Sequence, residues 1–140
     1  MSELSDSLED YLEAAWLLGR EAGCARACDI GRRLRVSKPS VNSAMKALAA
    51  RGLIKQERYG SVCLTPRGLK AGAEIAGRHS LLKDFFTSIL RLSPAEAEKD
   101  ACRAEHALGR EALRRMGALA RFLKSPARKR LLAASGEAVK

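Results

Sequence analysis

Hydrophobic residues recur at helical spacing over residues 5–19, and this pattern predicts an amphipathic helix at the start of the chain. Ser5 or Ser7 is suited to cap its first turn, and Gly19 and Gly23 punctuate its end. The apolar positions of this helix are Leu8, Tyr11, Leu12, Ala15, Trp16 and Leu18. A second helix is expected at about 26–34, with Ala27, Ile30 and Leu34 on one side.

A third helix is expected after a tight connection at Val36, with Ser37 as its N-cap and Pro39 in its first turn. It closes at Gly52, and its buried stripe is Val41, Ala44, Met45 and Leu48. Residues 53–65 then hold two short runs of strand character around an Arg-Tyr-Gly-Ser turn, which is typical of a β-hairpin. Helix, helix, tight turn, helix and hairpin together predict a winged helix-turn-helix.

The remaining pattern is helical. Thr65 and Pro66 start a long helix that runs to about Leu90, and Ser93 and Glu96 form a capping box for a helix at about 94–107. A further helix is expected at about 110–123, and Pro126 separates a short basic last piece. The predicted fold class is therefore mainly α. Residues 1–72 are expected to form an N-terminal winged helix-turn-helix, and residues 73–140 are expected to form a helical domain.

Charge gives the predicted winged helix a partner. The net charge is +10, and residues 26–78 carry twelve Lys or Arg against three Asp or Glu. A basic block in a small protein favours a polyanion, and the third helix is suited to the major groove of double-stranded DNA. The residues expected to bind DNA are Arg26, Ser37, Lys38, Pro39, Ser40, Asn42, Ser43, Lys46, Arg58 and Tyr59.

Other features of the composition exclude some classes of protein. No apolar run approaches the roughly 18 residues of a membrane span, and the N-terminus lacks the pattern of a secretion signal. We therefore expect a cytoplasmic protein with no membrane association. The four cysteines, Cys24, Cys28, Cys63 and Cys102, are expected to be free thiols in that compartment. The sequence offers no phosphate-binding loop and no nucleophile–base pair, so we do not expect an enzyme.

Two groups of residues have the spacing of a metal site. Asp10 and Glu13 are three positions apart on the first helix, and Cys102, Glu105 and His106 stand at i, i+3 and i+4 on a later one. His79 is the other of the two histidines. Carboxylate, imidazole and thiolate together suit a divalent first-row metal. Taken singly, the alternatives are a solvated acidic face, a small buried cysteine and a packed histidine.

The motifs that carry these features have a known counterpart. From Leu8 to about Met116 the chain resembles the diphtheria toxin repressor and manganese transport regulator family, through residues 9–13, 29–30, 36–41, 64–68, 78–79 and 101–106. The resemblance implies a homodimeric regulator of metal-uptake genes with two winged helices, which binds a pseudo-palindromic operator. It also implies that residues 73–140 are a helical metal-binding and dimerisation domain. The chain looks like the short form without the small C-terminal barrel domain.

The resemblance also implies a ligand set. Five of the six positions used by the manganese regulators match here, namely Asp10, Glu13, His79, Glu105 and His106. At the sixth, Cys102 replaces a carboxylate, as in the iron-responsive branch, which lacks the carboxylates at the other end of the site. The hard ligands favour Mn²⁺, and the thiolate favours Fe²⁺, Co²⁺ or Zn²⁺. Lys83 stands where that branch has a carboxylate of an ancillary site.

These expectations combine into a clamp. Ligands on the first helix and on the Cys102–His106 helix would bind one cation and hold the DNA-binding module against the dimerisation region. The dimer core is expected to include Leu108, Leu113, Met116, Leu119 and Phe122. Two alternatives remain open. One is a thiol or redox sensor on the same fold that uses Cys24 and Cys28, and the other is a metal-independent winged-helix transcription factor.

Overall fold

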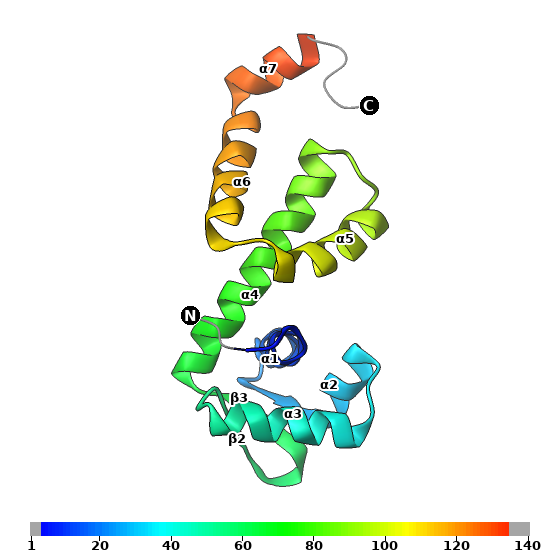
Figure 1. Ribbon diagram of the computed structural model, residues 1–140, viewed down its shortest axis with the longest axis vertical. Coiled ribbons are helices and arrows are strands. Elements are labelled where there is room, and N and C mark those ends of the chain that lie inside the picture. The colour runs from blue at the N-terminus through cyan, green and yellow to red at the C-terminus, as the bar shows by residue number, and fades with distance from the viewer. Residues whose placement is uncertain (1–3, 135–140) are drawn as a thin grey trace. The chain divides into compact units, whose positions relative to one another are not determined.

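The computed structural model describes residues 4–134, except for the side chains of Ala127 and Leu132. The chain forms two compact units, unit 1 (Met1–Ala76) and unit 2 (Gly77–Lys140), whose boundary falls inside the helix α4 (Pro66–Asp84). Figure 1 shows the elements in chain order, from blue α1 to red α7.

Unit 1 is a winged helix-turn-helix, as the sequence predicts. Its strands form an antiparallel sheet in the order β1-β3-β2, in which β2 and β3 are the hairpin of the wing. Its elements before α4 are α1 (Asp6–Gly19), β1 (Cys24–Arg26), α2 (Ala27–Leu34), α3 (Lys38–Ala50), β2 (Ile54–Gln56), the 3-10 turn η1 (Arg58–Gly60) and β3 (Ser61–Leu64).

Hydroxyl caps fix where these helices begin. The Ser5 side chain accepts a hydrogen bond from the Leu8 amide at 3.3 Å, and Ser37 accepts one from the Ser40 amide at 3.3 Å. Thr65 accepts one from the Gly68 amide at 3.1 Å. Each bond satisfies an amide of the first helical turn that has no partner within the helix. The three predicted helix starts are confirmed, with Ser5 rather than Ser7 as the first cap.

The core of unit 1 is built from the predicted apolar stripes. The fully buried side chains include Leu12 of α1, Ile30 of α2 and Leu48 of α3. Val41, Ala44 and Met45 are also buried, so all four predicted stripe positions of α3 face the core. Helical periodicity thus determined which side of α3 remains for contact with a partner.

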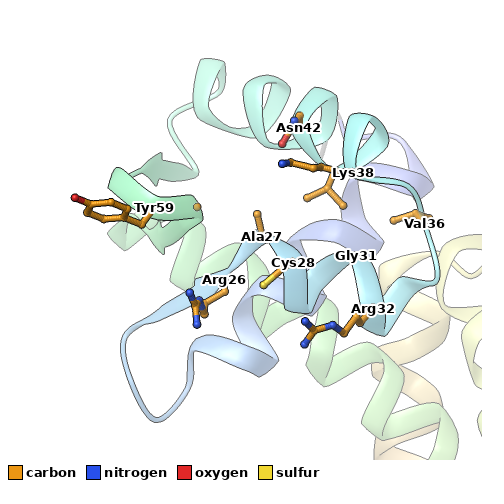
Figure 2. A pocket seen from close by; sticks show the side chains of 11 residues that line it. Arg26, Ala27, Cys28, Gly31, Arg32, Val36, Lys38, Asn42 and Tyr59 are labelled. Carbon is orange, nitrogen blue, oxygen red and sulfur yellow. The ribbon is translucent and has the colours of Figure 1, made fainter.

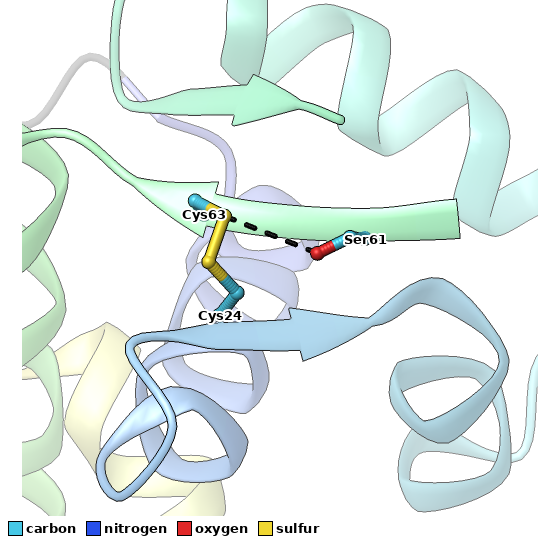
Figure 3. Close-up of a disulfide and its surroundings, with 3 residues drawn as sticks. All are labelled: Cys24, Ser61 and Cys63. Carbon is cyan, nitrogen blue, oxygen red and sulfur yellow. Dashed lines mark hydrogen bonds between the residues drawn. A yellow bond between two sulfur atoms is a disulfide. The ribbon is translucent and has the colours of Figure 1, made fainter. Parts of the chain in front are cut away.

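One strand and one covalent bond were not expected. Residues 24–26 form β1, so α2 begins at Ala27 and Arg26 is its extended N-cap residue. Strand β1 pairs with β3 in a register that sets Cys24 opposite Cys63, and these two residues form a disulfide (Figure 3). The prediction of four free thiols is therefore wrong for Cys24 and Cys63. The redox alternative, in which Cys24 and Cys28 act as a pair, is also wrong about the partner of Cys24, because Cys28 is a free thiol.

Unit 2 is helical. After α4 it contains the π-helical turn η2 (Phe85–Ile89), α5 (Pro94–Ala107), α6 (Arg110–Leu123) and α7 (Pro126–Ala134). The capping box of Ser93 and Glu96 is present at the start of α5, as predicted. No helix among the described residues is both long and apolar enough to cross a membrane.

The core of unit 2 corrects part of the expected dimer face. Leu113 is 5% exposed and belongs to a cluster with Leu82 and Ala101. Leu108 and Met116 are partly buried and pack against the same cluster. Leu119 and Phe122 are 47% and 50% exposed. Of the predicted interface residues, Leu113 therefore stabilises its own unit, because it faces inward from α6.

A glycine in the first turn of α4 allows this helix to pack closely against the start of the wing. A Cβ atom on Gly68 would lie 1.8 Å from the Leu53 carbonyl oxygen, whereas a Cβ on Gly77 of the same helix would meet nothing within 4 Å. The Leu53 carbonyl also accepts the Thr65 amide at 3.0 Å, so the first turn of α4 is tied to the start of β2. Only a residue without a side chain permits this approach.

We therefore expect Gly68→Ala to lower the free energy of unfolding by about 3 kcal/mol or more, because the backbone at Leu53 must move. The matched change Gly77→Ala should raise it by up to about 1 kcal/mol, since alanine has the higher helix propensity. Denaturant titration of both variants measures the difference. Equal effects would show that the contact at Gly68 is not rigid.

Candidate functional site

A basic hollow lies on the surface of unit 1. It has a volume of about 530 Å³ and lies between α2, the start of α3 and the wing. Figure 2 shows Arg26, Lys38 and Asn42 around it, with Tyr59 at the wing. These four of the predicted DNA-binding residues come from three separate segments, and the fold brings them together. The other six, Ser37, Pro39, Ser40, Ser43, Lys46 and Arg58, are exposed on the same unit.

The tip of the wing has a constrained backbone. Tyr59 has a φ angle of 62°, in the left-handed region, and its side chain is 94% exposed. Gly60 follows with a φ angle of 73°. A large aromatic side chain held out in solvent on a tight turn is available to an external partner rather than to the core.

Two residues of the hollow were missed by the sequence analysis. Arg32 and Cys28 both line it from α2. The Arg32 guanidinium contacts the Asp29 carboxylate at 3.0 Å, and its side chain is 78% exposed. Arg32 lies in the basic block of the sequence, so charge alone could have indicated it. Helical spacing in α2 did not indicate that it would face the same space as Lys38.

Unit 2 gathers metal-binding groups around His79. This residue lies on α4, and its Nδ1 atom is 3.0 Å from Glu105 Oε2 and 3.9 Å from Cys102 Sγ. Its Nε2 atom is 3.0 Å from Glu98 Oε1. Glu98, Cys102 and Glu105 are on α5, so one histidine joins two helices of this unit.

Four of the six predicted metal ligands are therefore close together in unit 2, namely His79, Cys102, Glu105 and His106. His106 Nε2 lies 3.4 Å from Glu105 Oε1, and Glu105 is only 2% exposed. The other two, Asp10 and Glu13, lie on α1 of unit 1, where both are half-buried. Glu98 was missed, although it stands four residues before Cys102 and so shares its helical face.

The carboxylates change the acidity of the histidine. The hydrogen bond from His79 to Glu105 raises its pKa to about 9, against the opposing effect of burial, and Glu98 adds to the increase. Lys83 lies 2.8 Å from Glu98 and is the main cause that lowers the pKa of that carboxyl, with His79 contributing less. The metal-free site therefore holds a protonated imidazole between two carboxylates at neutral pH.

The donor set fits a divalent cation. The ligand atoms of His79, Glu98 and Cys102 all lie within 4.8 Å of one another, so Glu98 has the position of either a ligand or a hydrogen-bond partner of the imidazole. Imidazole and thiolate favour later first-row metals, and carboxylate oxygens suit manganese. A cation bound here would replace the proton on His79 as the positive charge between the carboxylates.

Two family models match almost the whole chain. Residues 3–62 match the N-terminal DNA-binding domain of iron-dependent repressors. Residues 65–129 match their metal-binding and dimerisation domain. The family models thus assign the basic hollow and the His79 cluster to domains of different function.

Individual proteins agree. The chain is 35% identical over 116 residues to the HTH-type transcriptional regulator MntR of Shouchella clausii. These residues are 83% of this chain and 80% of that protein. A manganese-dependent transcriptional repressor in complex with manganese superposes with a TM-score of 0.74 at 27% identity, over 82% of this chain and 53% of that one. ScaR with bound Zn²⁺ gives a TM-score of 0.69 at 27% identity, over 84% and 55%. The chain therefore spans about half the length of these two solved proteins.

The raised pKa of His79 makes stability depend on pH. A group whose folded pKa is about 9, above its ordinary value of 6.5, contributes stability below pH 6.5 and loses that contribution as the pH rises through 9. We expect the metal-free protein to lose roughly 1–3 kcal/mol of unfolding free energy over this interval. Denaturant titrations with a chelator at several pH values measure the loss.

The matched variant for this measurement is His79→Gln, which keeps a polar side chain of similar reach but does not titrate. Its unfolding free energy should change much less between pH 6.5 and pH 9. A slope as steep as that of the parent would show that another group causes the dependence.

Proposed function

The chain belongs to the iron-dependent repressor family of metal-dependent transcriptional regulators, and we propose that in this member one divalent cation couples the two units and so controls binding to DNA. The observation that carries this proposal is the convergence of His79, Cys102 and Glu105 within unit 2. The protein is a DNA-binding regulator with a metal-binding and dimerisation domain, and its cofactor is a divalent metal ion.

The DNA-binding face consists of the ten exposed residues predicted from the sequence together with Arg32. Helix α3 supplies this face with short polar side chains suited to base edges, among them Asn42 and Ser43. Lys46 and Arg58 supply charge for the phosphate backbone. The exposure of all these side chains and the basic hollow between them support this assignment.

The metal site is completed by ligands from both units. Asp10 and Glu13 stand three positions apart on α1, and both are half-buried carboxylates. Together with His79, Cys102, Glu105 and His106 they make the ligand set that the family resemblance implies. Under this proposal, carboxylates of the two units would repel one another if they approached without a cation. When bound, the cation supplies the positive charge that lets them share one site, and the units are held together.

The protein acts as a homodimeric repressor of genes for metal homeostasis, in the cytoplasm, on a pseudo-palindromic operator. Support for the interface comes from the family model of the dimerisation domain and from exposed apolar residues. Leu119, Phe122 and Leu131 of α6 and α7 are 47%, 50% and 55% exposed. Two copies of a recognition helix would then meet successive turns of DNA, about 34 Å apart.

A second candidate function is control of DNA binding by thiol oxidation. It is favoured by the Cys24–Cys63 disulfide, which ties the wing strand β3 to β1 directly before α2. A metal titration repeated with and without a phosphine reductant distinguishes the two candidates, because only the redox candidate requires a response to the reductant without metal.

Loss of charge on the DNA-binding face should weaken binding to every sequence. We expect Lys46→Ala and Arg58→Ala each to reduce the slope of log affinity against log salt by about one unit, the effect of one phosphate contact. Fluorescence anisotropy on a generic duplex with saturating metal measures the slope. Lys99→Ala, an exposed lysine of α5, is the control and should keep the parent slope.

Loss of a unit 2 ligand should remove the metal response alone. His106→Ala is expected to abolish metal-stimulated binding to a duplex selected from a random pool with the metal-loaded parent, and to leave metal-free affinity and helicity unchanged. Glu111→Gln, a change of an exposed carboxylate on α6, should respond like the parent. A parent that responds to none of Mn²⁺, Fe²⁺, Co²⁺ and Zn²⁺ would refute the proposed function.

The choice of metal should follow Cys102. Cys102→Glu replaces a thiolate by a carboxylate, so the order of metals in the same titration should move toward Mn²⁺ and away from the later metals. An unchanged order would show that Cys102 is not a ligand and that the metal preference has another source.

A further inference from the structure

We propose that Glu98, which is outside the ligand set implied by the family resemblance, is a positioning residue of the metal site. It accepts the Nε2–H of His79, so that the Nδ1 atom of the same ring faces the cation together with Cys102 and Glu105. This inference rests on the proposed function of unit 2 as a metal-binding unit, and it names the residue that orients one of the ligands.

The two ring nitrogens of His79 face different groups. Both candidate ligands from α5 lie on the Nδ1 side, Glu105 Oε2 at 3.0 Å and Cys102 Sγ at 3.9 Å. The Nε2 side faces Glu98 Oε1 at 3.0 Å, and this oxygen also lies 3.9 Å from Cys102 Sγ, so the thiol is the neighbour that Glu98 and the Nδ1 side share. A histidine that binds a metal through one nitrogen usually donates the proton of its other nitrogen to a carboxylate or carbonyl, which fixes the tautomer and the ring orientation. Glu98 has the place and the charge for that role.

The contact with Lys83 argues against Glu98 as a ligand itself. Its second oxygen, Oε2, lies 2.8 Å from Lys83 Nζ. A dication bound directly to Glu98 would sit close to this ammonium and be repelled by it. A Glu98 carboxylate that only accepts a hydrogen bond from the imidazole N–H is compatible with the lysine, since both neighbours then donate hydrogen bonds to it.

The positions on the two helices make the arrangement a local one. His79 and Lys83 are four residues apart on α4, and Glu98 and Cys102 are four residues apart on α5, so each pair shares one helical face. Lys83 and Glu98 are 44% and 48% exposed, and an ion pair with that exposure adds little to stability. Its effect is to hold the Glu98 carboxylate at the Nε2 edge of His79.

The test uses the full chain loaded with Zn²⁺, which is diamagnetic, and long-range ¹H–¹⁵N correlation spectra of the histidine rings. We expect His79 to bind zinc through Nδ1 and to keep its proton on Nε2. Zinc on Nε2 of His79 would overturn the inference, because Glu98 would then face the metal rather than a proton.

Two substitutions separate a hydrogen-bond acceptor from a ligand. Glu98→Ala should weaken Co²⁺ affinity about 10-fold, as the loss of an orienting partner typically does, with one ion still bound per chain in unit 2. Glu98→Gln should recover most of the affinity, because an amide oxygen still accepts the Nε2–H but is a poor ligand. Equal losses in the two variants would identify Glu98 as a ligand and overturn the inference.

The controls distinguish this inference from the proposed function. Glu111→Gln changes an exposed carboxylate of α6 and should bind Co²⁺ like the parent. A parent that binds metal while Glu98→Ala binds it equally well would overturn the role of Glu98 and leave the proposed function intact. A parent that binds neither Zn²⁺ nor Co²⁺ would overturn both.

Discussion

Unit 2 depends on an imidazole held between two carboxylates. His79 of α4 meets Glu105 on one side and Glu98 on the other, each at 3.0 Å, and both carboxylates come from α5. The contact therefore joins two helices and places a carboxylate at each of the two N–H groups of a protonated imidazole. The same geometry that stabilises the positive charge of the ring also suits a divalent cation, because both neutralise the carboxylates. The side chains that join α4 to α5 are therefore the same ones that would bind the cation.

The mixed chemistry of the ligands has a consequence for metal choice. Carboxylates alone would place the site with the hard cations, whereas the Cys102 thiol 3.9 Å from His79 Nδ1 adds a soft donor. Such a set does not select by affinity alone, since later first-row metals bind most nitrogen and sulfur sites more tightly. The choice of metal then depends on how rigidly the ligands are held. Glu98 and its partner Lys83 matter for this reason, because they would fix the orientation of His79.

Unit 1 separates folding from recognition on one helix. The stripe of α3 that includes Val41 and Leu48 is buried, and the opposite face, with Asn42 and Lys46, is exposed. The disulfide from Cys24 to Cys63 closes a loop of 39 residues that contains α2, α3 and the wing tip. A crosslink of this kind limits the unfolded chain and typically stabilises a domain by roughly 2–4 kcal/mol. The disulfide therefore links the two ends of the segment that carries the DNA-binding face.

Local residue patterns were sufficient to predict most helices, their caps, the wing hairpin and the exposed polar face, since each depends on residues within a few positions of one another. They also indicated Cys102, Glu105 and His106, which share a face of one helix. Three other features arise from contacts between segments that are far apart in the sequence. The register of β1 on β3 created the disulfide, and the packing of α4 on α5 brought Glu98 to His79, 19 residues away. The inward side of α6 took Leu113 into the core of its own unit. These three outcomes depend on how distant segments pair and pack, and no local pattern reports that.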